Sequence, residues 1–243
     1  QKLYTLLIKN NPQSFYYSKS WHEEFGNPSV RATPWWEQKK ESLLSIAATQ
    51  SPCYVYDCDT VIKKADELLS VQSLDALFYA VKANPHPAIL QTLFDKGLGF
   101  ECVSTQEIER ILHTFPAIKK EKILFTPNFA SKSEYEYALS LGCYLTIDSL
   151  YPLEHWPTLF QNKSIFLRID PGSGAGHHKF VCTGGNESKF GITNANLPDV
   201  LKLVHAHNIS VIGLHAHSGS GILSPDLWQE TALMLAAETA RFP

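Results

Sequence analysis

A lysine and a turn of small residues, each at the end of an apolar run, are the residues of this sequence with the most specific chemistry. Lys82 lies at the end of the apolar run 77–83, and the run 211–217 is followed by Gly219, Ser220 and Gly221. An amine at the end of a buried strand can form a Schiff base with an aldehyde cofactor. A glycine-serine-glycine turn after another strand can hold a phosphate group. Together the two features predict a site for pyridoxal 5'-phosphate.

The reactivity of Lys82 depends on its surroundings. We expect Phe78, Val81 and the neighbouring strands to remove water from the amine and so to favour the neutral form that attacks an aldehyde. The alternative for a lone lysine is a strand end that reaches water. The glycine-serine-glycine turn on a second predicted strand favours the cofactor interpretation.

Two histidines precede that turn. His217 is the better candidate to lie flat against a cofactor ring, and we expect only one of His215 and His217 to face the site. Ser220 and the amides of Gly219 and Gly221 suit phosphate oxygens, although a plain glycine turn is the alternative. The histidines make a poor zinc pair because the sequence offers no nearby third ligand, so no metal site is predicted.

Two charged residues in predicted strands are candidates for the same site. Glu101, in Gly99–Val103, is expected to point its carboxylate toward the edge that carries Lys82, unless it is an ordinary surface glutamate. Arg168 lies in the apolar strand Ile165–Ile169, where a buried arginine needs partners. It is therefore either a site residue or part of an internal ion pair.

Two further segments have weaker signals. Asp148 and Ser149 follow a predicted strand, and we expect a helix cap there rather than a pair at the site, because an apolar periodic stretch comes next. The glycine-rich segment 172–185 contains His177, His178 and Lys179. It is either a substrate lid or an insertion without fixed structure.

Short apolar runs alternate with helical stretches along most of the chain. The predicted strands are Leu77–Ala83, Gly99–Val103, Lys122–Thr126, Cys143–Ile147, Ile165–Ile169 and Val211–His217. Repeated βα units with apolar strands are typical of a parallel sheet covered by helices, and this repeat length is typical of a (β/α)8 TIM-type barrel. We therefore expect an α/β fold, an incomplete barrel of about six of the eight units, with its chemistry at the carboxyl ends of the strands.

The chain divides into two expected regions. Residues 1–50 are polar, aromatic and interrupted by prolines, which indicates a leader or interdomain segment; its helix, Glu37–Ala48, should pack on the main domain. Residues 51–243 should form the partial pyridoxal-phosphate-binding barrel, beginning with a short strand at Cys53–Asp57. The predicted barrel helices are Val61–Ser70, Pro87–Lys96, Thr105–His113, Lys132–Leu141, Leu150–Phe160, Leu197–His207 and Pro225–Ala240.

The composition favours small-molecule chemistry in a reducing compartment. With 243 residues, of which 44% are hydrophobic, the chain can bury a sizeable core. A formal charge of −3 without a long run of like charges predicts no binding to nucleic acid or an anionic membrane. Five scattered cysteines argue against a disulfide framework, and no apolar stretch has the length of a membrane span. We expect a cytoplasmic protein.

A series of short motifs occurs in an order that resembles one enzyme family. The motifs are FYAVKAN, GFECVS, ILFTPNFAS, LTIDS, LRIDPG, SKFGI and GLHAHSGSGI. The sequence from about residue 50 to residue 243 thus resembles diaminopimelate decarboxylase, a pyridoxal-phosphate-dependent family with an alanine-racemase-like barrel. The segment Phe25–Arg31 with Pro34–Trp36 resembles the junction of bifunctional aspartate kinase/diaminopimelate decarboxylase proteins.

The resemblance implies a reaction and roles for the residues of the turn and the lysine. meso-Diaminopimelate would lose the carboxylate at its D-configured centre and give L-lysine and carbon dioxide, the last step of lysine biosynthesis. Lys82 would form the Schiff base with pyridoxal 5'-phosphate, and His217 would stack on its ring. Ser220, Gly219 and Gly221 would bind its phosphate.

The resemblance also implies partners and missing parts. Glu101 would take the place of an acidic residue near the lysine, and Arg168 that of an arginine at the strand ends. A homodimer acting on a small amino acid is implied for the complete protein. The family's later glycine-rich phosphate loop, its glutamate at the pyridine nitrogen and its C-terminal β-domain with a catalytic cysteine have no counterpart here. We therefore expect this chain alone to bind the cofactor weakly at best and to be inactive.

Three alternatives stay open at this point. The first is a related decarboxylase for arginine, ornithine or a carboxylated polyamine such as carboxynorspermidine. The second is a non-catalytic pyridoxal-phosphate-binding protein with the same barrel. The third is a parallel α/β domain whose motif matches are accidental.

Overall fold

A curved seven-stranded sheet forms the centre of the computed structural model, which describes residues 4–7, 33–172, 190–219, 222 and 225–242. The strands follow each other in chain order: β1 (Tyr4–Leu7), β2 (Ala76–Ala80), β3 (Gly99–Cys102), β4 (Ile123–Phe125), β5 (Tyr144–Ile147), β6 (Ser164–Arg168) and β7 (Ser210–His215). Each pair of neighbours from β2 to β7 is parallel. The predicted α/β fold with six parallel strands is therefore confirmed.

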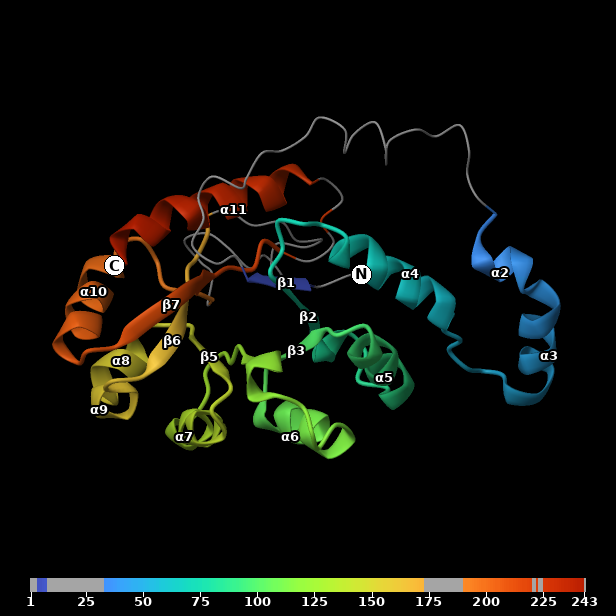
Figure 1. Ribbon diagram of the computed structural model, residues 1–243, viewed down its shortest axis with the longest axis horizontal. Coiled ribbons are helices and arrows are strands. Elements are labelled where there is room, and N and C mark those ends of the chain that lie inside the picture. Colours follow the sequence, from blue (N-terminus) through green and yellow to red (C-terminus); the bar gives the residue numbers. More distant parts are fainter. Residues whose placement is uncertain (1–3, 8–32, 173–189, 220–221, 223–224, 243) are drawn as a thin grey trace.

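One strand lies outside the prediction. β1 belongs to the polar leader and pairs antiparallel with β2, with Tyr4 opposite Tyr79. It also contacts β7, so the two edges of the described sheet approach each other and the sheet has the form of an incomplete barrel (Figure 1). The sequence pattern around β1 is short and lacks the βα repeat, which is why it gave no strand signal.

Helices cover the outside of the curved sheet (Figure 1). They are α4 (Cys58–Leu69), α5 (Pro87–Asp95), α6 (Thr105–Thr114), α7 (Lys132–Leu141), α8 (Tyr151–His155), α9 (Pro157–Phe160), α10 (Leu197–Ala206) and α11 (Asp226–Glu238). The single helix predicted over Leu150–Phe160 is divided at Trp156, because Pro157 has no amide N–H with which to continue the first helix. Local caps begin several of the others; the Ser104 hydroxyl, for example, accepts from the Glu107 amide at 3.3 Å.

The two faces of the sheet differ because side chains alternate along each strand. The outward face carries apolar residues that pack under the helices and form the main core with them. From β3 to β7 these are Phe100, Cys102, Ile123, Phe125, Leu145, Ile147, Ile165, Leu167 and Leu214. Burial of these side chains against the helices is the main stabilising term of the fold.

The inward face is divided into an apolar end and a polar end. Phe78, Leu124 and Phe166 form a small inner cluster, against which Tyr144 packs. Glycines make room for the two phenylalanines: a Cβ at Gly99 would lie 2.6 Å from the Phe78 ring, and one at Gly213 would lie 2.5 Å from the Phe166 ring. Further along the same inward face, toward the carboxyl ends, the side chains are polar.

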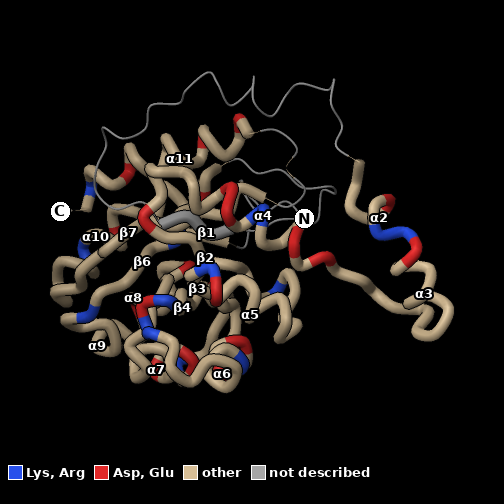
Figure 2. The backbone as a smooth tube through the Cα atoms, turned by 45° about the vertical axis from the view of Figure 1, so that its right-hand side comes forward, with Lys and Arg blue, Asp and Glu red and all other residues tan. Residues whose placement is uncertain are grey.

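The segment before the barrel differs from its prediction in two respects. The predicted helix at Glu37–Ala48 is present as α2 (Trp35–Gln38) and α3 (Lys40–Gln50), but neither contains a buried residue and both extend away from the barrel (Figures 1 and 2). The expectation that this helix packs on the main domain is therefore wrong. Its apolar residues are too few and too evenly distributed around the helix to form a buried stripe.

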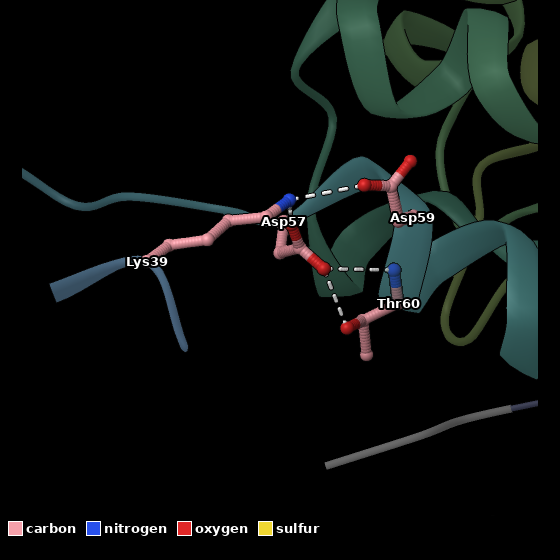
Figure 3. A network of polar contacts seen from close by, with 4 residues as sticks. All are labelled: Lys39, Asp57, Asp59 and Thr60. Carbon is pink, nitrogen blue, oxygen red and sulfur yellow. Dashed lines mark hydrogen bonds and ion pairs between the residues drawn. The ribbon is translucent and has the colours of Figure 1, made fainter. Parts of the chain in front are cut away.

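The predicted strand at Cys53–Asp57 is also wrong. This segment is extended but pairs with no described strand, and its aromatic side chains are exposed, Tyr54 to 92%. Asp57 instead begins α4, where its carboxylate accepts from the amide and the hydroxyl of Thr60 at 3.0 and 2.7 Å (Figure 3). Alternation of aromatic and β-branched residues favours an extended backbone, but a strand also needs a partner edge.

Charged residues of both signs are interspersed over the described helices (Figure 2). None of the helices in the described part of the chain has the length and hydropathy of a membrane span.

Candidate active site

A layer of polar side chains lies on the inward face of the sheet, at the carboxyl ends of the strands. Its members come from successive strands and are mostly buried: Glu101, Thr126, Asp148 and Arg168 are between 3% and 8% exposed, and His215 is partly buried. We call these five residues the strand-end layer. In β/α barrels this edge is where chemistry takes place, so the predicted location of the site agrees with the fold.

Lys82 lies beside this layer, on the turn Val81–Ala83 that follows β2. Its charge acts on Glu107, His215 and His217, which places the amine among the residues of the site. The expectation that neighbouring strands desolvate the amine is wrong, because the Lys82 side chain is exposed. The reason is that β2 ends at Ala80, two residues earlier than the lysine, so Lys82 is carried past the apolar strand.

Glu101 is an inward residue of β3 and is buried, which excludes the alternative of an ordinary surface glutamate. Its carboxylate accepts a hydrogen bond from the hydroxyl of Thr126, at the end of β4. Glu101 and Lys82 form no ion pair in this structure, although both are described. The residue of the layer that responds to its charge is Arg168.

Glu107 is a carboxylate near Lys82 that the sequence analysis did not select. It lies in the first turn of α6 and accepts from the Val103 amide at 2.8 Å. Burial raises the pKa of Glu107, and the charge of Glu101 adds to this, while Lys82 acts in the opposite direction. Its position, three residues after the cap Ser104, is one where glutamate is common for structural reasons, so the sequence alone gives no signal of a role in the site.

Arg168 ends β6 and is buried within the strand-end layer. Burial lowers the pKa of Arg168, while Asp148, Glu101 and Asp170 oppose this through their negative charges. Its guanidinium carbon lies 4.6 Å from the centre of the Phe190 ring, a cation–π distance. The buried arginine therefore has an aromatic face on one element and carboxylates on others.

Both histidines of the predicted pair face the site, contrary to our expectation that only one does. His215, the last residue of β7, lies opposite Arg168 in the pairing of β6 with β7. His217 lies two residues beyond it, and the charges of Arg168 and Lys82 act on both histidines. Burial, with the charges of Arg168 and Lys82, lowers the pKa of His217 to about 4. Burial likewise lowers the pKa of His215 well below its ordinary value. Both imidazoles are therefore neutral near pH 7.

His215 has a feature that points to a missing partner. Its Nδ1 is buried and makes no hydrogen bond with the described residues. A buried ring nitrogen of this kind costs free energy unless a ligand or a water satisfies it. No role in the site was predicted for His215 from the sequence.

Asp148 is also part of the layer rather than the expected helix cap. Its carboxylate accepts from Asn128 Nδ2 at 2.6 Å and from the Tyr135 hydroxyl at 3.4 Å. The helix that follows, α8, begins at Tyr151 and has no side-chain cap. The aspartate and serine before an apolar stretch indicated a cap. However, α8 begins at Tyr151 with Leu150 at its N-cap, so Asp148 lies two residues before the cap position.

The turn after β7 is described only in part, since Ser220 and Gly221 lie outside the described residues, as does the segment 173–189. Gly219 is buried and has a φ of 130°, a conformation that residues with a side chain rarely adopt. The preceding Ser218 donates a hydrogen bond to Thr231 of α11 at 2.9 Å, and Thr231 donates to the Leu227 carbonyl at 2.8 Å. This anchor to α11 was not apparent from the sequence.

The described residues fit pyridoxal phosphate. The Lys82 amine is accessible, the neutral imidazole of His217 offers a flat face, and the unpaired Nδ1 of His215 lies in the same layer. The backbone at Gly219 is free of a side chain where a phosphate would approach. Fold and site together define a β/α-barrel domain with an exposed lysine beside a charged strand-end layer.

Comparison with known proteins agrees with this class. Residues 58–238 match the family model of the pyridoxal-dependent decarboxylases, pyridoxal binding domain. The chain belongs to this family.

Among relatives, diaminopimelate decarboxylase of Methanothermobacter thermautotrophicus is 35% identical over 164 residues, 67% of this chain and 37% of that protein. The enzyme of the same name from Streptomyces coelicolor is 32% identical over 183 residues, 74% of this chain and 41% of that protein. The chain thus spans about two fifths of the length of these relatives.

Solved structures give the same picture. Helicobacter pylori diaminopimelate decarboxylase, complexed with L-lysine, superposes with a TM-score of 0.69 at 29% identity, covering 82% of this chain and 52% of that one. Arginine decarboxylase of Paramecium bursaria Chlorella virus, bound to agmatine, gives a TM-score of 0.68 at 21% identity, covering 83% of this chain and 54% of that one. The second likeness shows the fold alone.

Proposed function

We propose that this chain supplies the cofactor-binding barrel of an enzyme that decarboxylates meso-diaminopimelate to L-lysine and carbon dioxide. The observation that carries the proposal is Lys82, held on the turn after β2 within electrostatic range of His217. The names and the identity of the relatives support the substrate and the reaction.

In this proposal the Lys82 amine would hold pyridoxal phosphate, and the neutral imidazole of His217 would offer a face to its ring. Gly219, with Ser220 and Gly221, would hold the phosphate. When bound, pyridoxal phosphate supplies an electron-withdrawing ring that makes loss of the substrate carboxylate possible. The chain's own residues hold, orient and exchange protons around that chemistry.

Three charged residues of the site, Arg168, Glu101 and Lys82, would act on the cofactor or the substrate. Arg168 is positive and attracts anionic groups of cofactor or substrate to the strand ends. Glu101, fixed by the Thr126 hydroxyl, balances that charge. The exposed amine of Lys82 would be able to hold or release a proton at the strand ends.

The wider properties are proposals of the same kind. We infer a small amino-acid substrate, a homodimer for the complete protein and a cytoplasmic location. The last is supported by the free thiols of Cys53, Cys58, Cys102 and Cys143 in the described part of the chain. Residues 1–50 would serve as a leader or interdomain segment that adds β1 to the edge of the sheet, and residues 51–243 would form the rest of the barrel.

The test is to locate the lysine that reacts with pyridoxal phosphate. The chain is incubated with the cofactor, reduced with borohydride and digested, and the modified peptides are identified by mass spectrometry. We expect the label to concentrate on Lys82 and to disappear in Lys82→Ala. Lys132→Ala, which removes an exposed lysine of α7, should leave the labelling of Lys82 unchanged.

Equal labelling of many surface lysines in a chain shown to be folded by circular dichroism would overturn the assignment of Lys82. The substrate is tested separately on the full gene product, with meso-diaminopimelate, arginine and ornithine compared by carbon dioxide release. Preference for arginine or ornithine would favour a related decarboxylase, and labelling without any carbon dioxide release would favour a non-catalytic cofactor carrier.

A further inference from the structure

The guanidinium of Arg168 is buried without an acceptor for its N–H groups. Arg168 is 8% exposed, and none of the described residues forms a hydrogen bond or an ion pair with its guanidinium. The group does contact the Phe190 ring, at 4.6 Å, but that ring has no oxygen or nitrogen that could accept a hydrogen bond. Buried N–H donors without acceptors cost free energy. The strand-end layer therefore lacks an acceptor beside Arg168.

The carboxylates of the neighbourhood are occupied with other donors. Glu101 accepts from the Thr126 hydroxyl, and both oxygens of Asp148 are held by donors from other elements. Asp170, just after β6, accepts from the amide at residue 172 at 3.0 Å. The three negative charges act on Arg168 without an ion pair being formed. They compensate the charge of the guanidinium but leave its donors unused.

The residue beside Arg168 on the next strand has an unpaired nitrogen as well. β6 and β7 pair with Phe166 opposite Gly213 and Arg168 opposite His215. A Cβ at Gly213 would meet the Phe166 ring, which belongs to the inner cluster, so the side chains two residues further along each strand also point inward. The Nδ1 of His215 is buried and makes no hydrogen bond with the described residues. Two unpaired polar groups thus lie on neighbouring strands and on the same face.

The backbone around the two residues is held by hydrogen bonds on both sides of β6. The Ile169 amide donates to the His215 carbonyl at 2.8 Å. The Ile192 amide donates to the Arg168 carbonyl, also at 2.8 Å, and Phe190, two residues earlier, contacts the guanidinium. The backbone positions of both residues are therefore set before any ligand binds.

The charges of this place favour an anion as the ligand. Arg168 is positive, Lys82 adds a second positive charge, and burial with both charges lowers the pKa of His215, so its ring is neutral near pH 7. A neutral imidazole with its proton on Nδ1 is a donor, as the guanidinium is. A carboxylate or a phosphate has several acceptor oxygens and can bind both donors, and arginine is suited to hold such a group by paired hydrogen bonds.

We propose that Arg168 and His215 together form a two-point binding site for an oxyanion, a carboxylate or a phosphate, at the carboxyl ends of β6 and β7. The guanidinium donates to the anion, and Nδ1–H of His215 donates to one of its oxygens. That the anion belongs to the cofactor or to the substrate rests on the proposed function. The site itself is a property of the free chain, so the two ideas can fail separately.

The decisive experiment titrates the full chain, without cofactor, with inorganic phosphate and with sodium acetate at pH 7 and constant ionic strength. In 15N-labelled protein, the Arg168 Nε–H signal is identified by its loss in Arg168→Lys and the His215 ring signals by their loss in His215→Phe. We expect both sets of signals to shift saturably, with a common midpoint, for at least one of the two anions. Absence of a saturable shift at either residue with both anions would overturn the proposal.

Variants of His215 test the second point of the site. His215→Phe keeps a ring but removes Nδ1, so the affinity for the anion, measured from the Arg168 signal, should fall about tenfold or more. His215→Asn, whose side-chain amide can donate from near the position of Nδ1, should retain most of the affinity. His205→Phe, at an exposed position of α10, is the matched control and should leave the midpoint unchanged.

Full affinity in His215→Phe would show that Arg168 binds the anion alone and would overturn the two-point site. If His215→Phe does not fold, the question is decided in the wild type, where different midpoints for the Arg168 and His215 signals would contradict a shared anion.

Two further titrations identify which molecule supplies the anion. If pyridoxal phosphate shifts both signals and excludes inorganic phosphate, while pyridoxal does not, the anion is the phosphate of the cofactor. If the chain loaded with pyridoxal phosphate still binds acetate at both residues, the anion is a carboxylate such as that of an amino-acid substrate. Absence of labelling at Lys82 would count against the proposed function and leave the titration without cofactor to decide the anion site.

Discussion

His215, at the end of β7, and His217, just after it, show how their surroundings control the protonation of single residues. Burial removes water from each imidazole, and the positive charges of Arg168 and Lys82 act on both. Each of these effects lowers the pKa and favours the neutral ring. A neutral imidazole is better suited than a charged one to lie against an aromatic ring. The site is therefore arranged to keep His217 uncharged well below pH 7.

The pKa of His217 predicts a pH dependence of stability. Its value is about 4 in the folded chain, against about 6.5 for a histidine in an unfolded one. Between these values the unfolded chain binds the proton and the folded chain does not, so stability is lost as the pH falls through this window. The contribution is at most about 3 kcal/mol. Urea unfolding at pH 6.5 and 4.5 should show a smaller loss in His217→Gln than in the wild type.

The comparison of variant with wild type separates His217 from carboxylates, such as Asp148, whose raised pKa acts in the opposite direction. His113→Gln, at an exposed position of α6, should show the wild-type loss. An identical pH dependence in wild type and His217→Gln would mean that His217 is not shielded as described.

At the scale of the element, the inward face of the barrel depends on glycines placed opposite phenylalanines. Phe78 and Phe166 occupy the space that side chains at Gly99 and Gly213 would need. Glycine is otherwise unfavourable in a strand because it loses more conformational freedom on folding. Its use here lets two large rings fill the narrow interior below the strand-end layer, which in turn supports the polar residues above them.

Gly213→Ala is therefore expected to destabilise the chain. The new Cβ would lie 2.5 Å from Cε1 of Phe166, and the ring can move only by disturbing Tyr144, with which it is in contact. We expect the free energy of unfolding to fall by about 1–3 kcal/mol, measured by urea denaturation. Ser210→Ala, at the exposed start of the same strand, should have little effect.

Phe166→Leu provides the complementary test of this contact. In its background, Gly213→Ala should cost clearly less than in the wild type, because the clash is relieved. Additive costs in the double variant would show that the alanine destabilises the strand for some reason other than contact with Phe166.

The described part of the molecule consists of the curved barrel and an arm, α2 and α3, that buries no residue. Lys39 forms ion pairs with Asp57 at 2.5 Å and Asp59 at 3.0 Å, at the start of α4 (Figure 3). The Lys39 pKa is raised, chiefly by its hydrogen bond to Asp57. α2 and α3 bury no residue, and the Lys39 side chain that forms both pairs is 46% exposed, so we expect the pairs to orient the arm without stabilising the barrel.

Lys39→Ala should therefore change the arm and leave the barrel as it is. We expect faster amide hydrogen exchange in α2 and α3, with no measurable change in the urea midpoint of the barrel, because exposed ion pairs contribute little to stability. Lys202→Ala, which removes another exposed ion pair, on α10, should leave the exchange of the arm unchanged. A lowered midpoint in Lys39→Ala would show that the arm is part of the cooperative unit.

Local signals in the sequence determined the elements and the edge of the site. Apolar strand runs, helix periodicity and short turns depend on residues near one another in the chain, so β2 to β7 and the positions of Lys82 and Arg168 could be predicted. The absence of a strand at Cys53–Asp57 and the exposure of α3 could not be predicted, because both depend on a partner surface that local patterns do not reveal.

The tertiary structure alone decided which side chains meet. The pairing of Thr126 with Glu101, the clamp of Asn128 and Tyr135 on Asp148 and the anchor of Ser218 on Thr231 each join different elements. Their formation depends on the register and curvature of the sheet, which are set by packing across the whole barrel. For the same reason, the sequence placed a lysine at a strand end but could not show that the turn after β2 leaves it exposed.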